Sequence, residues 1–209
     1  MKILIADDHA IVREGVKQIV KTLPEVTLID EASEGNEALL KIKEVGYDLV
    51  ILDISMPGMS GLDILQSISS RKINTRVLML SLHPQEQYAI RAFKLGASGY
   101  LSKDSAFEEL TTAIHKIAAG GKYVSSAFAE KLIFTESEQG AQNLHDPLSD
   151  REFQVMIMLA KGKTVLEIAK EIFISDKTVS TYRSRIMEKM GMKKNTDLTR
   201  YAINNKLIE

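Results

Sequence analysis

Five polar residues in the first half of the chain stand where short apolar runs end. Asp7 and Asp8 follow ILIA, Asp53 follows LVIL, Ser81 follows VLML and Lys103 follows GYLS. Three carboxylates brought close together repel one another and are costly without a cation. Oxygen ligands with places left for water suit Mg²⁺, and a lysine and a serine hydroxyl beside the metal can bind phosphoryl oxygens. These residue types indicate metal-assisted chemistry in which Asp53 is the nucleophile and forms an acyl phosphate.

The five side chains can meet only if the apolar runs are neighbouring strands. The runs are short, bounded by turn or charged residues and mostly apolar on both faces. They predict strands at Ile3–Ala6, Thr27–Glu31, Leu49–Leu52, Val77–Leu80 and Ser98–Leu101. Segments with helical periodicity follow each strand, at Ile11–Thr22, Asn36–Val45, Leu62–Ser70, Gln85–Leu95 and Phe107–Ala119.

This alternation predicts an α/β fold with a five-stranded, doubly wound parallel sheet, because parallel strands need crossover connections. In such a sheet, ligands bind outside the carboxyl ends of the strands, which is where the five polar residues fall. A single aspartate at a strand end is more often a helix cap. Five polar residues in register across the sheet make that alternative much weaker.

The second half of the chain has a different pattern. After Pro147, four segments have helical periodicity: Asp150–Lys161, Val165–Ile172, Lys177–Met190 and Thr196–Asn204. Ser149 is expected to cap the first, with Glu152 closing a capping box. We therefore predict three parts: an α/β domain over residues 1–120, a polar linker over 121–147 with a possible short helix at Ser125–Phe134, and a small all-α domain over 148–209.

Charge differs between the two domains. The chain has a formal net charge of −1, yet residues 148–209 hold 12 Lys and Arg against 8 Asp and Glu. An acidic first part and a basic second part indicate modules with different partners, although chance variation of two solvated surfaces is an equal alternative.

Two of the predicted helices, Val165–Ile172 and Lys177–Met190, are joined by Phe173–Asp176 in a helix-turn-helix pattern. In the second helix, one face is expected to pack inward through Val179, Tyr182 and Ile186. Small polar and basic residues face the other way: Lys177, Ser180, Thr181, Ser184 and Arg185, with Arg183 nearer the boundary. Such a face fits the major groove of double-stranded DNA. An ordinary amphipathic helix in a small bundle, with Ser175 and Thr178 as caps, remains the alternative.

Composition excludes several other classes of site. The chain has no cysteine and only four histidines, which rules out disulfides, thiolate zinc sites and a cysteine nucleophile. No apolar run approaches the roughly 18 residues of a membrane span, and the start is too short in apolar residues for a signal peptide. We expect a cytoplasmic protein without membrane contact.

The first 120 residues resemble the receiver domain of two-component response regulators. ILIADDH, LVILDISMPGMSG, VLMLS and GYLSKD occur in order and at family-like spacing. The resemblance implies a CheY-like receiver fold in which Asp53 accepts a phosphoryl group from a sensor histidine kinase. It also implies that Mg²⁺ is the cofactor, held by Asp7, Asp8 and Asp53 with the backbone carbonyl of Ser55 as a further ligand, and that Lys103 contacts the phosphoryl group.

The same resemblance implies a switch pair, Ser81 and Tyr100. The serine hydroxyl moves onto the phosphoryl group, and the aromatic ring follows into the vacated space. Such a change is a population shift between two packings, biased by contacts to phosphate.

Residues Leu148–Ile208 resemble the LuxR-type helix-turn-helix of the NarL/FixJ response regulators, through LSDRE, LAKGKTVLEIAKEIFIS, KTVSTY and NNKLI. The KTVSTYRSR segment looks closer to the branch that contains BvgA, EvgA and GacA. Many relatives have lysine in place of Ser180 and histidine in place of Tyr182, so family-wide base contacts do not transfer directly. We assign phosphate contacts instead to other basic residues: Lys177, Arg183 and Arg185, with Lys193 and Lys194 at the rim.

The combined resemblance predicts a transcription regulator, not an enzyme, that dimerises and binds promoters when Asp53 is phosphorylated. The last helix commonly dimerises in this family, and here Leu198, Tyr201 and Ala202 form an apolar face that either dimerises or completes the domain core. The alternative function is a DNA-binding regulator that acts without phosphorylation. A haloacid-dehalogenase-like phosphatase is disfavoured, because Ser55 stands where those enzymes have a second aspartate.

Overall fold

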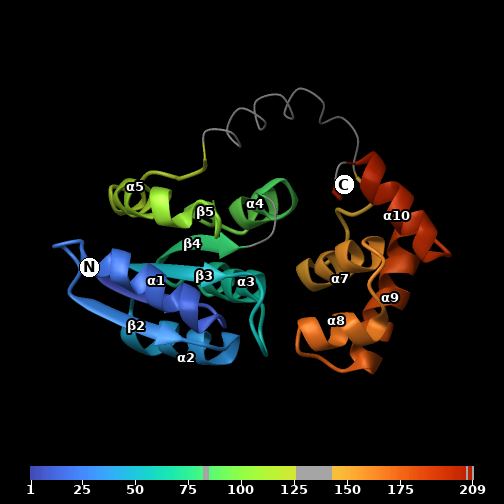
Figure 1. Cartoon of the computed structure of the whole chain (residues 1–209), viewed down its shortest axis with the longest axis horizontal. Helices are drawn as coiled ribbons and strands as arrows, with labels where there is room; N and C mark the ends of the chain where they lie inside the picture. The colour runs from blue at the N-terminus through green and yellow to red at the C-terminus, as the bar shows by residue number, and fades with distance from the viewer. Residues whose placement is uncertain (82–84, 126–142, 206, 209) are drawn as a thin grey trace. The chain divides into compact units, whose positions relative to one another are not determined.

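The computed structural model describes residues 1–81, 85–125, 143–205 and 207–208. The chain divides into two compact units, unit 1 over residues 1–133 and unit 2 over residues 134–209 (Figure 1). In the part of the chain that is described, no helix is long and apolar enough to cross a membrane. The helix predicted over Ser125–Phe134 falls outside the described residues, apart from Ser125 itself.

Unit 1 is a doubly wound α/β fold, as predicted. Its strands are β1 (Lys2–Ala6), β2 (Leu28–Ala32), β3 (Leu49–Asp53), β4 (Arg76–Ser81) and β5 (Gly99–Ser102). Its helices are α1 (Ala10–Lys21), α2 (Gly35–Val45), α3 (Gly61–Ser70), α4 (Gln85–Lys94) and α5 (Ala106–Ala118). All neighbouring strands are parallel, in the order β2-β1-β3-β4-β5. The chain order reverses between β1 and β3, which is the position where sheets of this topology bind ligands.

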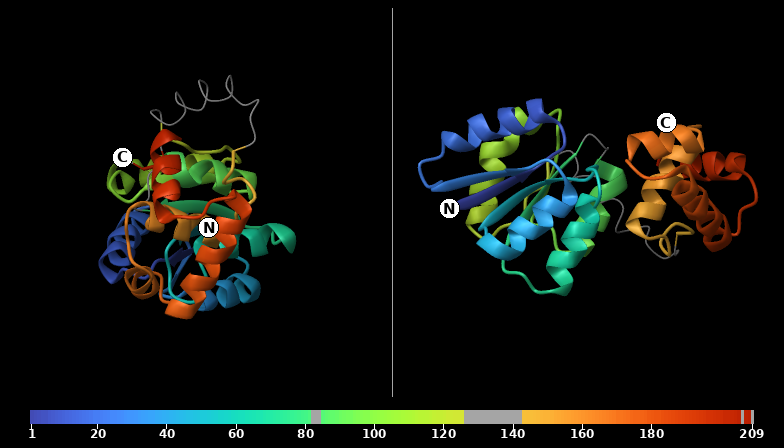
Figure 2. Two further views of the ribbon diagram at one scale, coloured as in Figure 1. Left: turned by 90° about the vertical axis from the view of Figure 1, so that its right-hand side faces the viewer. Right: turned by 90° about the horizontal axis from the view of Figure 1, so that it is seen from below.

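The sheet is covered on both faces, with α1 and α5 on one side and α2, α3 and α4 on the other (Figure 2). Every residue of β3 is buried. A core cluster joins Ile5 and Ile51 of the sheet to Val16 of α1 and Ile114 of α5. Burial on both faces explains the near-continuous apolar runs of the sequence, because a strand covered on both faces has no polar side.

The loop after β3 folds back tightly against the strand. Ser60 caps α3 in a capping box with Asp63, and the backbone N–H of Gly61 donates to the carbonyl of Ile54 at 2.9 Å. A Cβ atom on Gly61 would lie only 2.0 Å from the carbonyl oxygen of Asp53. Glycine therefore allows the start of α3 to pack directly on the backbone that carries Asp53.

Unit 2 is all helical in its described part, as predicted. It contains α7 (Asp150–Ala160), α8 (Val165–Glu171), α9 (Asp176–Met190) and α10 (Asn195–Asn204). The predicted capping box of Ser149 and Glu152 is confirmed. Ser175 caps α9 by accepting a hydrogen bond from the backbone N–H of Thr178, which is the capping role that the sequence left open.

The turn between α8 and α9 is held from α7. Arg151 of α7 is buried, and its guanidinium donates to the carbonyl oxygen of Ile172 at 3.1 Å. The next residue, Phe173, has a φ of 55°, a left-handed conformation that is uncommon for a bulky side chain. The hydrogen bond from Arg151 ties the turn between α8 and α9 to α7.

Candidate functional site

The carboxyl edge of the sheet brings three aspartates together. Ala6 of β1 pairs with Leu52 of β3, so Asp7 and Asp53 follow in register on neighbouring strands. Both side chains are buried, and Asp8 is partly buried beside them. The predicted meeting of these residues at one edge is therefore what the structure shows.

Lys103 reaches the same place from β5. Its backbone N–H donates to the carbonyl oxygen of Ser81 at 2.8 Å, which fixes the start of the loop after β5. Its Nζ lies 2.6 Å from Oδ2 of Asp7 and 2.9 Å from Oδ2 of Asp53. One buried ammonium group thus bridges two buried carboxylates.

Burial dominates the electrostatics of this cluster. Burial raises the pKa of Asp53 to about 7, and Asp7 adds to the rise, while Lys103 and a backbone hydrogen bond from Ser55 oppose it. For Lys103, burial by itself lowers the pKa, but the two carboxylates outweigh it and leave the pKa raised. A buried carboxyl group with a pKa near neutrality beside a specific charge partner is a candidate for a functional group.

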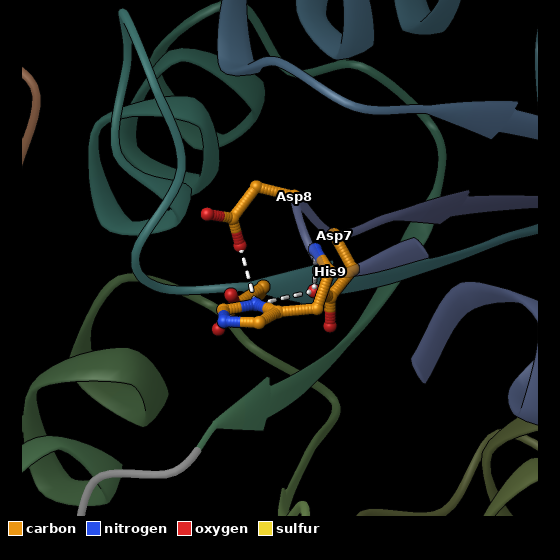
Figure 3. A group of neighbouring side chains, drawn as sticks. Asp7, Asp8 and His9 are labelled. Atoms are coloured by element: carbon orange, nitrogen blue, oxygen red, sulfur yellow. Dashed lines mark hydrogen bonds and ion pairs between the residues drawn. The ribbon is translucent and has the colours of Figure 1, made fainter. Parts of the chain in front are cut away.

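The sequence interpretation missed two residues that shape the site, His9 and Arg13. The Nδ1 atom of His9 lies 2.7 Å from Oδ1 of Asp8 and 3.2 Å from Oδ1 of Asp7 (Figure 3). Arg13 donates to the backbone carbonyl of Asp7 at 2.7 Å and also pairs with Glu31. The spacing of His9 and Arg13, four apart at the start of α1, is the feature of the sequence that points to their shared position.

The cluster suits a divalent cation. Asp7, Asp8, His9 and Asp53 each offer one ligand atom, and these atoms all lie within 4.8 Å of one another. Three of the four donors are carboxylate oxygens, the type that Mg²⁺ requires. The donor set therefore fits the predicted metal, and a cation there would relieve the repulsion between Asp7 and Asp53.

The predicted switch residues lie on neighbouring strands. Ser81 pairs with Ser102 and Met79 pairs with Tyr100, and side chains two positions apart on a strand share a face. Ser81 and Tyr100 therefore point to the same side of the sheet, and both are fully buried.

In unit 2, α9 presents the polar face that the sequence predicted. Val179 and Ile186 are buried, and Tyr182 is partly buried. The exposed residues of the helix include Lys177, Ser180, Thr181, Ser184 and Arg185. The hydroxyls of Thr181 and Ser184 donate to carbonyl oxygens of their own helix, at 3.0 and 3.1 Å, so their remaining capacity is to accept.

The basic residues around α9 differ in how exposed their side chains are. Arg183 is partly buried, and its Nε donates to Oδ1 of Asn195 at 2.9 Å, which turns its guanidinium toward the start of α10. Lys193 and Lys194 are exposed just before that helix. This placement agrees with the boundary position expected for Arg183.

The apolar face predicted for the last helix is turned inward. Leu198 and Ala202 are fully buried, and α10 packs against α7 within unit 2. The hydroxyl of Tyr201 lies 2.7 Å from Nδ1 of His145. Leu198 and Ala202 belong to the core of unit 2, Tyr201 is partly buried beside them, and Ile203 is exposed on the same helix.

Comparison with known proteins assigns both units. Residues 3–115 match the family described as response regulator receiver domain, and residues 146–202 match the luxR family of bacterial regulatory proteins. The chain is 32% identical over 208 residues to the response regulator UvrY of Escherichia coli K12, with 99% of this chain and 95% of UvrY covered.

It is 36% identical over 216 residues to the oxygen regulatory protein NreC of Staphylococcus aureus MRSA252, with both chains fully covered. A solved LuxR-family response regulator from Aurantimonas sp. SI85-9A1 is similar at a TM-score of 0.61 and 32% identity, over 65% of this chain and 97% of that one.

Proposed function

Because the chain belongs to the NarL/FixJ-type two-component response regulators, which join a receiver domain to a LuxR-family helix-turn-helix domain, we propose that phosphorylation of Asp53 switches its binding to promoter DNA. The partners are a sensor histidine kinase, double-stranded DNA and a second copy of the chain, and the site of action is the cytoplasm. The receiver spans residues 1–120, the linker 121–147 and the DNA-binding domain 148–209.

One observation carries the proposal: a buried lysine bridges two buried aspartates at the ligand-binding edge of the sheet. A carboxylate oxygen of Asp53 forms a bond to phosphorus as the bond from phosphorus to the kinase histidine nitrogen breaks, and the electron pair leaves with that nitrogen. Lys103 is placed to neutralise phosphoryl oxygens. Asp7, Asp8 and Asp53, with the backbone carbonyl of Ser55, would hold Mg²⁺, and the ion would supply further positive charge there.

The switch uses Ser81 and Tyr100. The hydroxyl of Ser81 donates to a phosphoryl oxygen on Asp53, and the ring of Tyr100 moves into the space that Ser81 leaves. Their shared face of the sheet and their full burial support this coupling, because a close-packed interior passes from one packing to another and does not deform smoothly.

The DNA reader is α9. Lys177, Arg183 and Arg185 contact phosphates, Ser180, Thr181 and Ser184 face the major groove, and Lys193 and Lys194 contribute from the rim. Exposure of this face and burial of Val179 and Ile186 behind it support the assignment. Because one helix reads few base pairs, two copies bind paired half-sites, and we propose that phosphorylation favours the dimer. Leu198 and Ala202 are buried against α7 and cannot meet a second copy, so a dimer through α10 would use the side of the helix that carries the exposed Ile203.

The test is selection of genomic DNA fragments at fixed salt after treatment with acetyl phosphate and Mg²⁺. The native chain and Asp104→Asn, which removes an exposed carboxylate next to Lys103, are expected to enrich the same fragments only after treatment. Asp53→Asn is expected to show no such dependence. If all three proteins select the same DNA without treatment, the chain is a regulator that acts without phosphorylation.

The salt dependence of DNA binding tests the reader separately. Arg185→Ala is expected to weaken binding and to flatten the plot of log affinity against log salt by about one unit, because it removes one interaction with a phosphate. Lys43→Ala removes the same charge from a site on α2, outside the reader, and should leave the slope unchanged. An unaltered slope for Arg185→Ala would mean that Arg185 does not bind a phosphate.

A further inference from the structure

Arg183 of α9 is held by a neutral side chain of the next helix. Its Nε donates to Oδ1 of Asn195 at 2.9 Å, and Asn195 is the first residue of α10. Both residues are partly buried. An arginine side chain has several rotatable bonds, and a hydrogen bond across the turn between two helices restricts them.

The charge of this arginine is left unbalanced by its partner. Lys163 and Lys189, elsewhere in unit 2, each pair with a carboxylate. In the described part of the chain, no carboxylate forms an ion pair with Arg183, and its partner is an amide. An amide oxygen fixes the direction of a guanidinium without cancelling its charge. Arg183 is therefore ordered and still able to attract an anion.

The hydrogen bond uses only part of the guanidinium. Arginine has five N–H donors in a fixed plane, and the one on Nε is given to Asn195. The groups on Nη1 and Nη2 remain, and a pair of them can bind two oxygens of one phosphate. A side chain that is ordered before it binds loses less conformational entropy on binding.

The start of α10 adds positive charge through side chains. Lys193 and Lys194 are exposed immediately before the helix. Their backbone N–H groups donate to Oδ2 of Asp197, at 3.4 and 3.0 Å, so these two groups are already taken. An anion at this position is therefore bound by side chains, and Arg183 is the one whose direction a hydrogen bond fixes.

We propose that Asn195 is a positioning residue for DNA binding, which holds the guanidinium of Arg183 so that Nη1 and Nη2 bind one backbone phosphate of double-stranded DNA. The proposal rests on the proposed function and deepens it, because it assigns the residue that orders one of the phosphate contacts. Lys193 and Lys194 add to the positive potential around that phosphate.

The test measures binding of the full chain to a fluorescent DNA duplex of random sequence at several salt concentrations, after treatment with acetyl phosphate and Mg²⁺. A random sequence suffices, because phosphate contacts supply binding of this kind. Asn195→Ala keeps the charge of Arg183 and removes its support. The affinity is expected to fall about twofold to tenfold. The slope of log affinity against log salt should stay the same, because the number of phosphates contacted does not change.

Asn195→Asp is the sharper variant. A carboxylate in the first turn of a helix is favourable, so this variant should keep α10, but its negative charge pairs with Arg183. The slope is expected to flatten by about one unit, as in Arg183→Ala, which removes the positive charge outright. The matched controls are Asn74→Ala and Asn74→Asp, at an exposed position before β4 in unit 1, and they should leave affinity and slope unchanged.

A double variant separates positioning from a purely structural role. If Asn195 acts through Arg183, the variant Arg183→Ala/Asn195→Ala should bind no more weakly than Arg183→Ala alone. An unchanged affinity in Asn195→Ala, an unchanged slope in Asn195→Asp, or a further loss in the double variant would each overturn the inference while the native chain still binds the duplex. A native chain that does not bind the duplex would overturn the DNA-binding function, and the inference with it.

Discussion

Asp53 in unit 1 and Glu152 in unit 2 are both buried carboxylates that pair with a lysine, yet their pKa values move in opposite directions. The side chains are 3% and 4% exposed. The Nζ of Lys103 lies 2.9 Å from Asp53, and the Nζ of Lys189 lies 2.6 Å from Glu152. The pKa of Asp53 is raised to about 7, whereas the pKa of Glu152 is lowered.

The difference comes from what surrounds each pair. Burial opposes ionisation of Glu152, but Lys189 and the backbone N–H of Ser149, at 2.8 Å, outweigh it. Lys189 is itself 38% exposed, so its charge is solvated. Asp53 shares a buried lysine with a second buried carboxylate, Asp7, and the burial penalty prevails.

A carboxylate whose charge is already satisfied has a structural role, here as part of a capping box. A carboxylate whose charge is incompletely satisfied can gain from a cation. Divergent pKa values of chemically similar groups therefore make Asp53, and not Glu152, the candidate for a functional carboxylate.

Removing the lysine should affect unit 1 most strongly. Lys103→Met leaves Asp7 and Asp53 buried together without their cation, and loss of one partner from a buried ion pair costs about 3 to 5 kcal/mol. Urea unfolding of the full chain, followed by hydrogen–deuterium exchange of peptides from β3 and β5, measures this loss.

The double variant Lys103→Met/Asp53→Asn is the control for this prediction. It removes one of the two unpaired charges and should recover part of the lost stability. A loss below about 1 kcal/mol in the single variant, the range of exposed pairs, would mean that Lys103 does not hold the carboxylates together.

The two carboxylates should also give opposite pH dependence. The raised pKa of Asp53 means that this group binds more protons in the folded state than in the unfolded state, so its contribution to the stability of unit 1 falls as pH rises from about 4 to 7. The lowered pKa of Glu152 means that its contribution is present above the ordinary glutamate pKa and is lost as pH falls through the folded value.

Carboxyl ¹³C NMR titration of the full chain with a chelator present measures both groups directly. Asp53→Asn should abolish the neutral titration and leave that of Glu152 in place. Two carboxyl groups titrating together near their ordinary values would erase the contrast between the units.

The sequence predicted only part of what Glu152 does. The capping box of Ser149 and Glu152 follows from a spacing of three residues, so it is visible locally and is confirmed. The pairing of Glu152 with Lys189, 37 residues further on, depends on how α7 meets α9. No local pattern contains that information.

The carboxyl edge of the sheet in unit 1 shows the same limit. The predicted strand ends bring Asp7, Asp8, Asp53 and Lys103 together, because the carboxyl ends of parallel strands lie at one edge of the sheet. The contribution of His9 and Arg13 was missed, since each depends on a side-chain direction at the start of α1. Periodicity likewise found the apolar stripe of α10 and left open whether its partner is the same domain or a second copy.

Lys189→Met should reduce the stability of its unit much less than Lys103→Met does. Lys189 is more than one-third exposed, and pairs of that kind contribute about 1 kcal/mol or less. Glu152 keeps its hydrogen bond from Ser149, so the carboxylate remains charged and α7 remains capped. Urea unfolding followed by exchange of α7 and α9 peptides should therefore show a loss of about 1 kcal/mol or less, well below that of Lys103→Met. Equal losses in the two variants would mean that burial of the lysine does not set the difference, and that Asp53 is held as Glu152 is.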